Sequence, residues 1–374
     1  MLVVRMLAIV YLLSAASLPA QATALGRPTG RLAEEFSDIR GARELKDGRL
    51  IVSDYIDQRV VLVDFEKGTV TSRIGKGGGP AEVRLPTRLT PLAGDSTMVA
   101  DIGNNRLLIV DGEGRGARTI PVTQEGLLGA RGVDRSGAFY FAIPGWAERD
   151  KELPNDSVRI VRWNPRTGAM TNVAVVQGER MRSDIRSPAL TPRIPTVGYA
   201  AQDNWVVSDA GVLRIVRGGN YQVESRAPGA APVIGPSYAY PTRPVTASER
   251  AAYVHEFIAG SPTSGKGANG GMGQTPMPSD AELAQITRGT EFASHHPMFE
   301  PGAVKVTPGG QLWVGRRAGS GNTMQYDIFD AAGRRTATVV LPPDRRVILI
   351  GRQSVYLIAD DDDIQRLERY PLPK

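Results

Sequence analysis

A strand pair that recurs along the chain constrains the fold more than any other feature of this sequence. Each copy contains a turn with Gly or Asp, a strand of β-branched or aromatic residues, a polar loop and a second apolar strand. The first strands of the six copies cover residues 49–54, 96–101, 138–143, 204–209, 311–316 and 355–360. Their partners cover residues 59–64, 106–111, 158–163, 212–217, 324–329 and 364–370.

The spacing of these copies predicts the architecture. Three of the spacings are 47, 42 and 44 residues, which is typical of one four-stranded antiparallel blade, and the spacings of 66 and 107 residues leave room for insertions. The strands are nearly continuous in apolar residues, as expected when both faces of a sheet are buried. We therefore predict an all-β fold, a six-bladed β-propeller over residues 28–374, with residues 28–36 supplying the outer strand of the sixth blade and so removing an open edge.

One stretch resembles a known repeat family. The segment IGKGGGPAEVRLP (74–86), followed by MVADIGNNRLLIVD (98–111), is similar to the NHL-repeat signature, and SDYIDQRVVLVD (53–64) repeats part of it. The resemblance covers residues 50–111 and fades beyond them, because the later copies lack the Asn-Arg element. It implies a propeller architecture. It also implies that the Asp at the end of a strand caps a loop.

The N-terminus has the layout of a secretory signal peptide. Arg5 precedes an apolar run from Met6 to Leu18, and small residues follow at Ala20, Ala22 and Ala24. We expect cleavage near Ala22, so residues 1–22 form the signal, no membrane span remains after cleavage, and the mature protein is periplasmic or extracellular. The chain has no cysteine, so it has neither a disulfide nor a lipid-accepting cysteine.

The connections between strands differ between the two faces of the predicted propeller. If the strands of a blade are named a to d from the centre outward, the a-to-b and c-to-d turns on one face are short. The long insertions, 144–157, 178–196 and 228–302, all fall on the opposite face, which we call the inserted face. Loops that vary in this way favour a binding role for that face.

The longest insertion has two predicted helices. Capping boxes at Thr246–Glu249 and Ser279–Glu282 open helices that end near 259 and 289. The pair is either a lid or a passive cover over the seam between blades 4 and 5, with an apolar stripe of Val254, Phe257 and Ile258.

Carboxylates and histidines are expected to have structural roles. Asp54, Asp101, Asp209 and Asp360 end the predicted strands, where Asp accepts backbone N–H groups at a turn. The acidic run 360–363 lacks the spaced oxygen ligands of a calcium loop. The histidines, His255, His295 and His296, lie in the insertion without the spacing of a metal site. We expect no catalytic residue, no metal site and no cofactor.

A set of basic residues marks the predicted innermost strands. Each lies five to seven residues before the a-to-b turn of its blade, and the set comprises Arg43, Arg88, Arg131, Lys305 and Arg346. If these side chains face the central channel, they would bind an anionic ligand. The alternative is that they face sheet edges or pair with acids such as Glu44.

The formal net charge is +6 at pH 7, spread along the chain. Nucleic-acid binding is therefore not indicated for an exported chain. The leading hypothesis is a monomeric, non-catalytic propeller that binds a small anionic ligand or a protein partner at the inserted face. The alternative is a channel-site hydrolase or lyase of the lactonase or amidating-lyase type.

Overall fold

The structure is a computed structural model. It describes residues 22–124, 126–145, 154, 156–178, 197–259, 262–266, 272–274, 277–299, 302–318, 323–361 and 364–373. Residues 1–21 of the predicted signal peptide, most of the predicted insertions 144–157 and 178–196, and part of the segment between the two helices lie outside the described residues.

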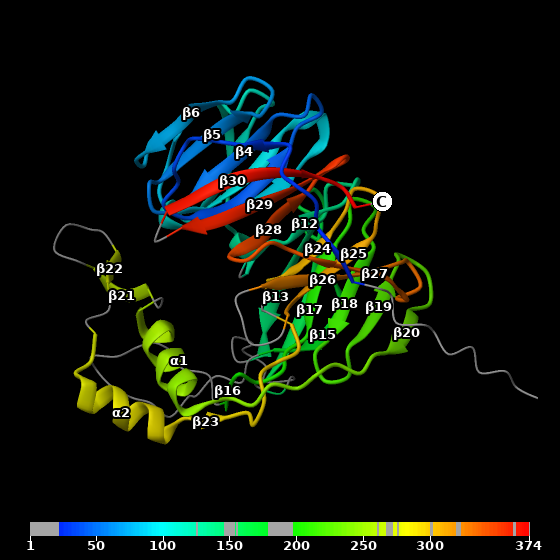
Figure 1. Ribbon diagram of the computed structural model, residues 1–374. Helices are drawn as coiled ribbons and strands as arrows, with labels where there is room; N and C mark the ends of the chain where they lie inside the picture. The colour runs from blue at the N-terminus through cyan, green and yellow to red at the C-terminus, as the bar shows by residue number, and fades with distance from the viewer. Residues whose placement is uncertain are drawn as a thin grey trace, which may run out of the picture.

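The described strands form the six sheets of a six-bladed β-propeller (Figure 1), which confirms the predicted fold class. Blade 1 contains β3 (Ile39–Glu44), β4 (Leu50–Asp54), β5 (Arg59–Asp64) and β6 (Thr69–Lys76), with β7 (Glu82–Val83) added at its edge. Blade 2 contains β8 (Pro86–Pro91), β9 (Thr97–Asp101), β10 (Arg106–Val110) and β11 (Gly116–Pro121). Blade 3 contains β12 (Gly132–Val133), β13 (Phe139–Pro144), β14 (Ser157–Trp163) and β15 (Met170–Gln177).

The second half of the ring repeats this plan. Blade 4 contains β17 (Asn204–Val207), β18 (Leu213–Arg217), β19 (Gln222–Arg226) and β20 (Val233–Ser237). Blade 5 contains β24 (Val304–Val306), β25 (Leu312–Arg317), β26 (Met324–Phe329) and β27 (Arg335–Val340). Blade 6 contains β28 (Arg345–Ile350), β29 (Ser354–Asp361) and β30 (Ile364–Pro371). Short 3-10 turns occur at Ala93–Asp95, Ile102–Asn104 and Leu127–Gly129.

The alternation of side chains along a strand explains why the blades pack on both faces. In β4, Leu50 and Val52 pack into the seam with blade 6, whereas Ile51, which points the other way, packs into the seam with blade 2. Every residue of β4 is buried. Among the described residues, one buried apolar cluster fills each of the six seams between neighbouring blades. The core is therefore a ring of seams, and burial in these seams stabilises the fold at roughly 25 cal/mol per Å² of apolar surface.

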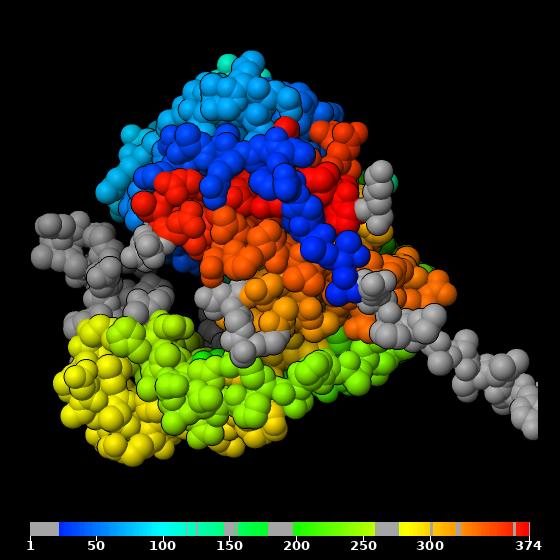
Figure 2. Space-filling model, in the orientation of Figure 1, coloured from blue at the N-terminus to red at the C-terminus, as the bar shows by residue number. Residues whose placement is uncertain are grey.

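The N-terminal segment closes the ring, as the sequence predicts. Strand β2 (Gly30–Arg31) pairs antiparallel with β30, and Phe36 forms a bridge with Gln365. Phe36 and Leu32 are buried in the seam between blades 6 and 1. Figure 2 shows this segment, in blue, lying across the red and orange C-terminal blades. The sixth blade thus obtains its fourth strand from the opposite end of the chain.

The same segment also contacts blade 5. Strand β1 (Ala22–Ala24) runs parallel to the outer strand β27, and the Leu25 N–H donates to the Val340 carbonyl oxygen at 2.8 Å. The segment 22–36 therefore covers the outer edges of two blades.

Blade 4 corrects one sequence-based assignment. The recurring strand pair occupies the second and third positions of the other blades, so residues 204–209 were expected to be a second strand. Instead, residues 204–207 form the innermost strand, because β17 contacts β12 and β24, the innermost strands of the adjacent blades. The predicted partner 212–217 is accordingly the second strand, and Asp209 lies in an a-to-b turn. The exposed carboxylate of Asp209 pairs with Arg135 at 2.9 Å instead of capping a loop.

The insertion between blades 4 and 5 contains the two expected helices, α1 (Ala247–Ala259) and α2 (Asp280–Gly289), which pack on each other. Ser279 forms the predicted capping box with Glu282, and Thr246 forms the same pair of bonds with Glu249. Short strands accompany the helices: β16 (Val197–Gly198), β21 (Pro262–Lys266), β22 (Met272–Gln274) and β23 (Glu291–Phe292).

Candidate functional site

The six innermost strands surround the axis of the propeller. Each of β3, β8, β12, β17, β24 and β28 contacts the innermost strands of its neighbours. Four of the five basic residues predicted to face the axis lie on or directly beside four of these strands. Arg88 is in β8, Arg131 directly precedes β12, Lys305 is in β24 and Arg346 is in β28. We call these four residues the axial basic cluster.

The contacts of Arg88 and Arg131 place them side by side. Arg88 Nη1 donates to the carbonyl oxygens of Gly129 and Ala130 at 3.2 and 3.4 Å, immediately before Arg131 in the chain. Burial, reinforced by the charge of Arg88, lowers the pKa of Arg131 to about 10. Burial likewise lowers the pKa of Arg88. Each guanidinium is thus held in protein surroundings that disfavour its charge.

Arg131 is oriented by the innermost strand of blade 4. Its Nη1 donates to Asn204 Oδ1 at 2.9 Å and to the Trp205 carbonyl oxygen at 3.0 Å. The guanidinium carbon lies 4.6 Å from the centre of the Trp205 ring, within the range of a cation–π contact. Residues of blade 4 therefore fix the position of Arg131, which comes from blade 3.

The other three cations of the cluster lower the pKa of Lys305. Burial, followed by the charges of Arg88, Arg346 and Arg131 in that order, lowers the pKa of Lys305 to about 8 from its ordinary 10.5. In the described part of the chain, no hydrogen bond or ion pair is recorded for its ammonium group. Arg346 has a carboxylate neighbour, because its Nε lies 3.5 Å from Asp360 Oδ2.

The cluster therefore carries excess positive charge. Among the described residues, Asp360 is the one carboxylate within ion-pair distance of a cluster residue, Arg346. The cluster therefore has four cations and one acidic partner. The excess is three positive charges when Lys305 is protonated and two when it is neutral. Such a group of fixed guanidinium forks and one amine is suited to carboxylate or phosphate oxygens.

Arg43, the fifth predicted residue, lies apart from the cluster. Its guanidinium donates to Asp95 and the Ser96 carbonyl oxygen in the a-to-b turn of blade 2, and to Thr97 Oγ1 at the start of β9. Asp95 Oδ1 lies 3.0 Å from Arg43 Nη2. Arg43 thus joins blades 1 and 2 on the face opposite the insertions.

Asp54 and Asp101 have the loop-capping role that the NHL resemblance implies. Asp54 accepts the backbone N–H groups of Ser37 and Asp38. Asp101 accepts the Arg84 N–H at 2.8 Å and pairs with Arg106 at 3.0 Å. Both side chains are fully buried, so their charge is used within the fold.

An aromatic cluster holds the helical insertion together. Tyr253 and Phe257 of α1 pack against each other, and Tyr253 also contacts Tyr199 and Phe292. His296 lies against Tyr199, with ring centres 4.5 Å apart, and its Nε2 is 3.1 Å from Glu249. Within the described ranges, no group of three potential metal-ligating side chains occurs.

The apolar stripe predicted for the first helix is present in part. Val254 and Ile258 are fully buried. Because Tyr199 comes from the connection between blades 3 and 4, the cluster joins the insertion to a second loop of the inserted face.

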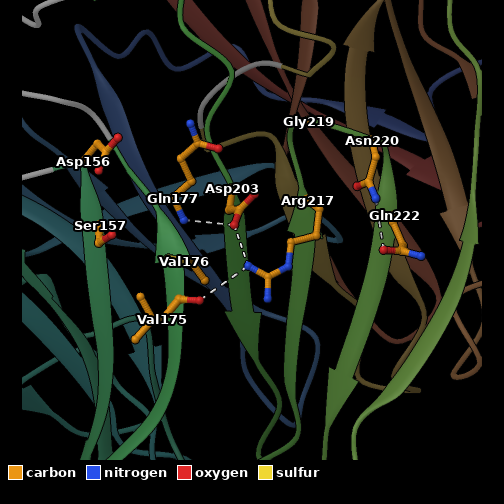
Figure 3. A pocket seen from close by; sticks show the side chains of 10 residues that line it. All are labelled: Asp156, Ser157, Val175, Val176, Gln177, Asp203, Arg217, Gly219, Asn220 and Gln222. Atoms are coloured by element: carbon orange, nitrogen blue, oxygen red, sulfur yellow. Dashed lines mark hydrogen bonds and ion pairs between the residues drawn. The ribbon is translucent and has the colours of Figure 1, made fainter. Parts of the chain in front are cut away.

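A polar pocket of about 540 Å³ lies on the inserted face at the seam of blades 3 and 4 (Figure 3). Asp203 accepts from the Gln177 N–H at 3.0 Å and from Arg217 at 2.6 Å, and Arg217 also pairs with Glu224. The amides are also bonded, because Asn220 donates to Gln222 and Gln222 donates to the Gly235 carbonyl oxygen. Sequence reasoning missed this pocket, because no motif marks residues brought together from strands and loops of two blades.

A second groove, of about 830 Å³, lies on the opposite face between blades 1 and 6. Two of its arginines are paired with carboxylates. Arg352 contacts Glu44 at 3.2 Å and Arg369 contacts Glu66 at 2.5 Å. The axial basic cluster differs from both in bringing together three cations, Arg88, Arg131 and Lys305, for which the described residues show no ion pair.

No helix among the described residues is long and apolar enough to cross a membrane. No family model matches the sequence, and no curated protein matches it.

Several solved structures are similar over most of the chain. Regucalcin from Agrobacterium tumefaciens, described as a calcium-binding protein, is 12% identical with a TM-score of 0.44, covering 94% of this chain and 97% of its own. A gluconolactonase from Xanthomonas campestris is 13% identical with a TM-score of 0.44, covering 95% and 99%. Virginiamycin B lyase from Staphylococcus aureus is 10% identical with a TM-score of 0.38, covering 90% and 81%. The six-bladed assignment rests on the strand order and seams described above.

Proposed function

We propose that this protein binds a small anion with two or more negative charges through the axial basic cluster. The observation that carries the proposal is that Arg88, Arg131 and Lys305 lie together at the innermost strands with no carboxylate recorded against them in the described residues. Unpaired cations in protein surroundings cost free energy. A bound anion would offset that cost.

The geometry suits carboxylate or phosphate groups. Arg131 uses Nη1 for Asn204 and Trp205, which leaves its other donors for a ligand. Arg88 likewise uses only Nη1 for the carbonyl oxygens recorded against it. Guanidinium groups bind such oxygens in pairs of parallel hydrogen bonds.

We also propose that the mature protein is exported and acts as a monomer. The support is the signal-like N-terminus with small residues at Ala20, Ala22 and Ala24. The chain without cysteine gives no site for a lipid anchor. The ligand would then be a periplasmic or extracellular small molecule, and the inserted face would be available to a protein partner.

A channel-site hydrolase or lyase is the second candidate function. The observation that favours it is Lys305, whose pKa of about 8 leaves a fraction of the amine uncharged near neutral pH.

Calorimetric titration of the mature protein tests the proposed function. Citrate, succinate and inorganic phosphate serve as probes, with the neutral dimethyl ester of succinate as the matched control. We expect binding of the anions, weakening with added NaCl, and no binding of the ester. Arg88→Gln and Arg346→Gln should each weaken binding at least about tenfold, because each removes a charge-assisted hydrogen bond.

The exposed residue Arg334, which pairs with Asp330, provides the matched control. Arg334→Gln removes one positive charge far from the axis and should leave binding unchanged. Equal losses in all three variants would refute the assignment to the axis. For the second candidate, lactone hydrolysis by the mature protein that is lost in Lys305→Met would favour catalysis through the amine.

A further inference from the structure

The polar pocket between blades 3 and 4 has two walls that come from different blades. Asp156, Ser157 and the end of β15 form one wall, and Asn220 and Gln222 belong to the other (Figure 3). Its volume of about 540 Å³ is in the range of small-molecule sites. None of its lining residues belongs to the axial basic cluster, so any ligand here would be independent of the anion proposed for the axis.

The floor of the pocket holds the two walls together. Asp203 accepts the backbone N–H groups of Gln177 and Gly218, each at 3.0 Å, and an N–H of Arg217 at 2.6 Å. Arg217 also pairs with Glu224 at 2.6 Å. These groups are used within the fold, so the floor fixes the separation of the walls and a ligand has to bind to the walls themselves.

The open polar groups of the walls are mainly acceptors. Within the ranges that the structure describes, the Asp156 carboxylate and the Ser157 hydroxyl have no hydrogen-bond or ion-pair partner. On the opposite wall, Asn220 Nδ2 donates to Gln222 Oε1 at 3.2 Å, which leaves Asn220 Oδ1 as an acceptor. A ligand rich in N–H donors is therefore complementary to these walls.

The charge of the pocket is opposite in sign to that of the whole chain. Its charged lining residues are Asp156, Asp203 and Arg217, which leave one negative charge in excess, whereas the chain carries +6. Beside these groups lies Val175, whose side chain is 46% exposed although it is apolar. The pocket thus combines an unpaired carboxylate with an uncovered aliphatic side chain.

We propose that this pocket binds the ammonium group of a small alkylamine. A primary ammonium has three N–H donors and no acceptor, so it can donate to the Asp156 carboxylate and the Ser157 hydroxyl. The alkyl chain then packs against Val175 and removes apolar surface from water. The guanidinium of Arg217 repels the cation from the floor, which keeps the ammonium on the wall of Asp156.

Calorimetric titration of the full mature protein with cadaverine tests this proposal. The control ligand is the uncharged diol of the same chain length. We expect saturable binding of the diamine that weakens with added NaCl, and no binding of the diol. Asp156→Asn should weaken binding at least about tenfold, because it removes a charge-assisted hydrogen bond. Val175→Ser should weaken it about threefold, because it removes part of the apolar contact.

The matched control is Glu256→Gln, which removes an exposed carboxylate of α1 and should leave binding unchanged. An unchanged Tm shows that each variant is folded. Diamine binding should persist in Arg88→Gln, and succinate binding should persist in Asp156→Asn, so the two sites are tested separately. Absence of diamine binding, equal binding of the diol, or equal losses in Asp156→Asn and Glu256→Gln would overturn the amine site without affecting the proposed function.

Discussion

The replacement Lys305→Met should stabilise the protein at neutral pH. In the folded chain, burial and the neighbouring arginines lower the pKa of Lys305 from 10.5 to about 8. The unfolded chain therefore binds more protons than the folded chain between these values, and stability rises as the pH is raised across this window. Below pH 8, the folded protein bears the full cost of the protonated amine.

The magnitude follows from the pKa difference. About 1.4 kcal/mol per unit gives an upper value near 3 kcal/mol, and the solvent contact that Lys305 retains reduces this to about 2 kcal/mol. For a chain of this length, that corresponds to a rise in Tm of about 3 °C. Methionine fills the position of the lysine chain without a charge.

The assay is chemical denaturation of wild type and variant at pH 7 and at pH 10.5. We expect the gain at pH 7 to shrink to a few tenths of a kcal/mol at pH 10.5. The matched variant Lys76→Met, at an exposed position, should show no such pH dependence. A gain that is equal at both pH values, or a loss at pH 7, would refute the electrostatic account of Lys305.

Three further changes test the fold around the site. Asp101→Ala should lower the free energy of unfolding by about 3 kcal/mol, measured by urea denaturation, because Arg106 and the Arg84 N–H lose their buried acceptor. Gly41→Ala should cost about 1 to 3 kcal/mol in the same assay, since its Cβ would meet the Thr87 carbonyl oxygen at 2.7 Å and the Leu89 nitrogen at 2.9 Å; an unchanged midpoint would contradict the close approach of blades 1 and 2. Tyr253→Ala should speed proteolytic cleavage within 238–303 while leaving the Tm of the propeller within about 2 °C, because the aromatic cluster belongs to the insertion.

The blade architecture was predictable because the pattern of the strands has a single physical explanation. Continuous apolar runs such as the one at Leu50–Val52 require burial on both faces, and short turns at regular spacing leave little alternative to stacked blades. Closure by residues 28–36 followed from counting three strands in the last blade. Both expectations depend on local patterns that survive in the folded chain.

Blade 4 was misassigned for an equally physical reason. Residues 204–207 carry the β-branched and aromatic side chains of a second strand, yet they form the innermost one. The pattern of a buried strand is the same at both places, because each is covered on two faces. Only contacts with the neighbouring innermost strands distinguish the two positions.

The position of Arg43 shows the limit of spacing arguments at the site. Arg43 pairs directly with Ile51 across the sheet, and directly opposite residues point to the same face. Ile51 packs into the seam between blades 1 and 2, but Lys305 likewise lies opposite a buried seam residue, Trp313. Arg43 is separated from the cluster by its bonds to Asp95, Ser96 and Thr97, which the sequence does not reveal.

A crystal structure of the mature protein grown in selenate would test the central claim most directly. Anomalous scattering from selenium would locate the dianion without ambiguity. We predict an ordered selenate within hydrogen-bond distance of Arg88, Arg131 and Arg346, next to the amine of Lys305. A carboxylate of this same chain found in ion pairs with Arg88 and Arg131, with no selenate on the axis, would contradict the proposed anion site.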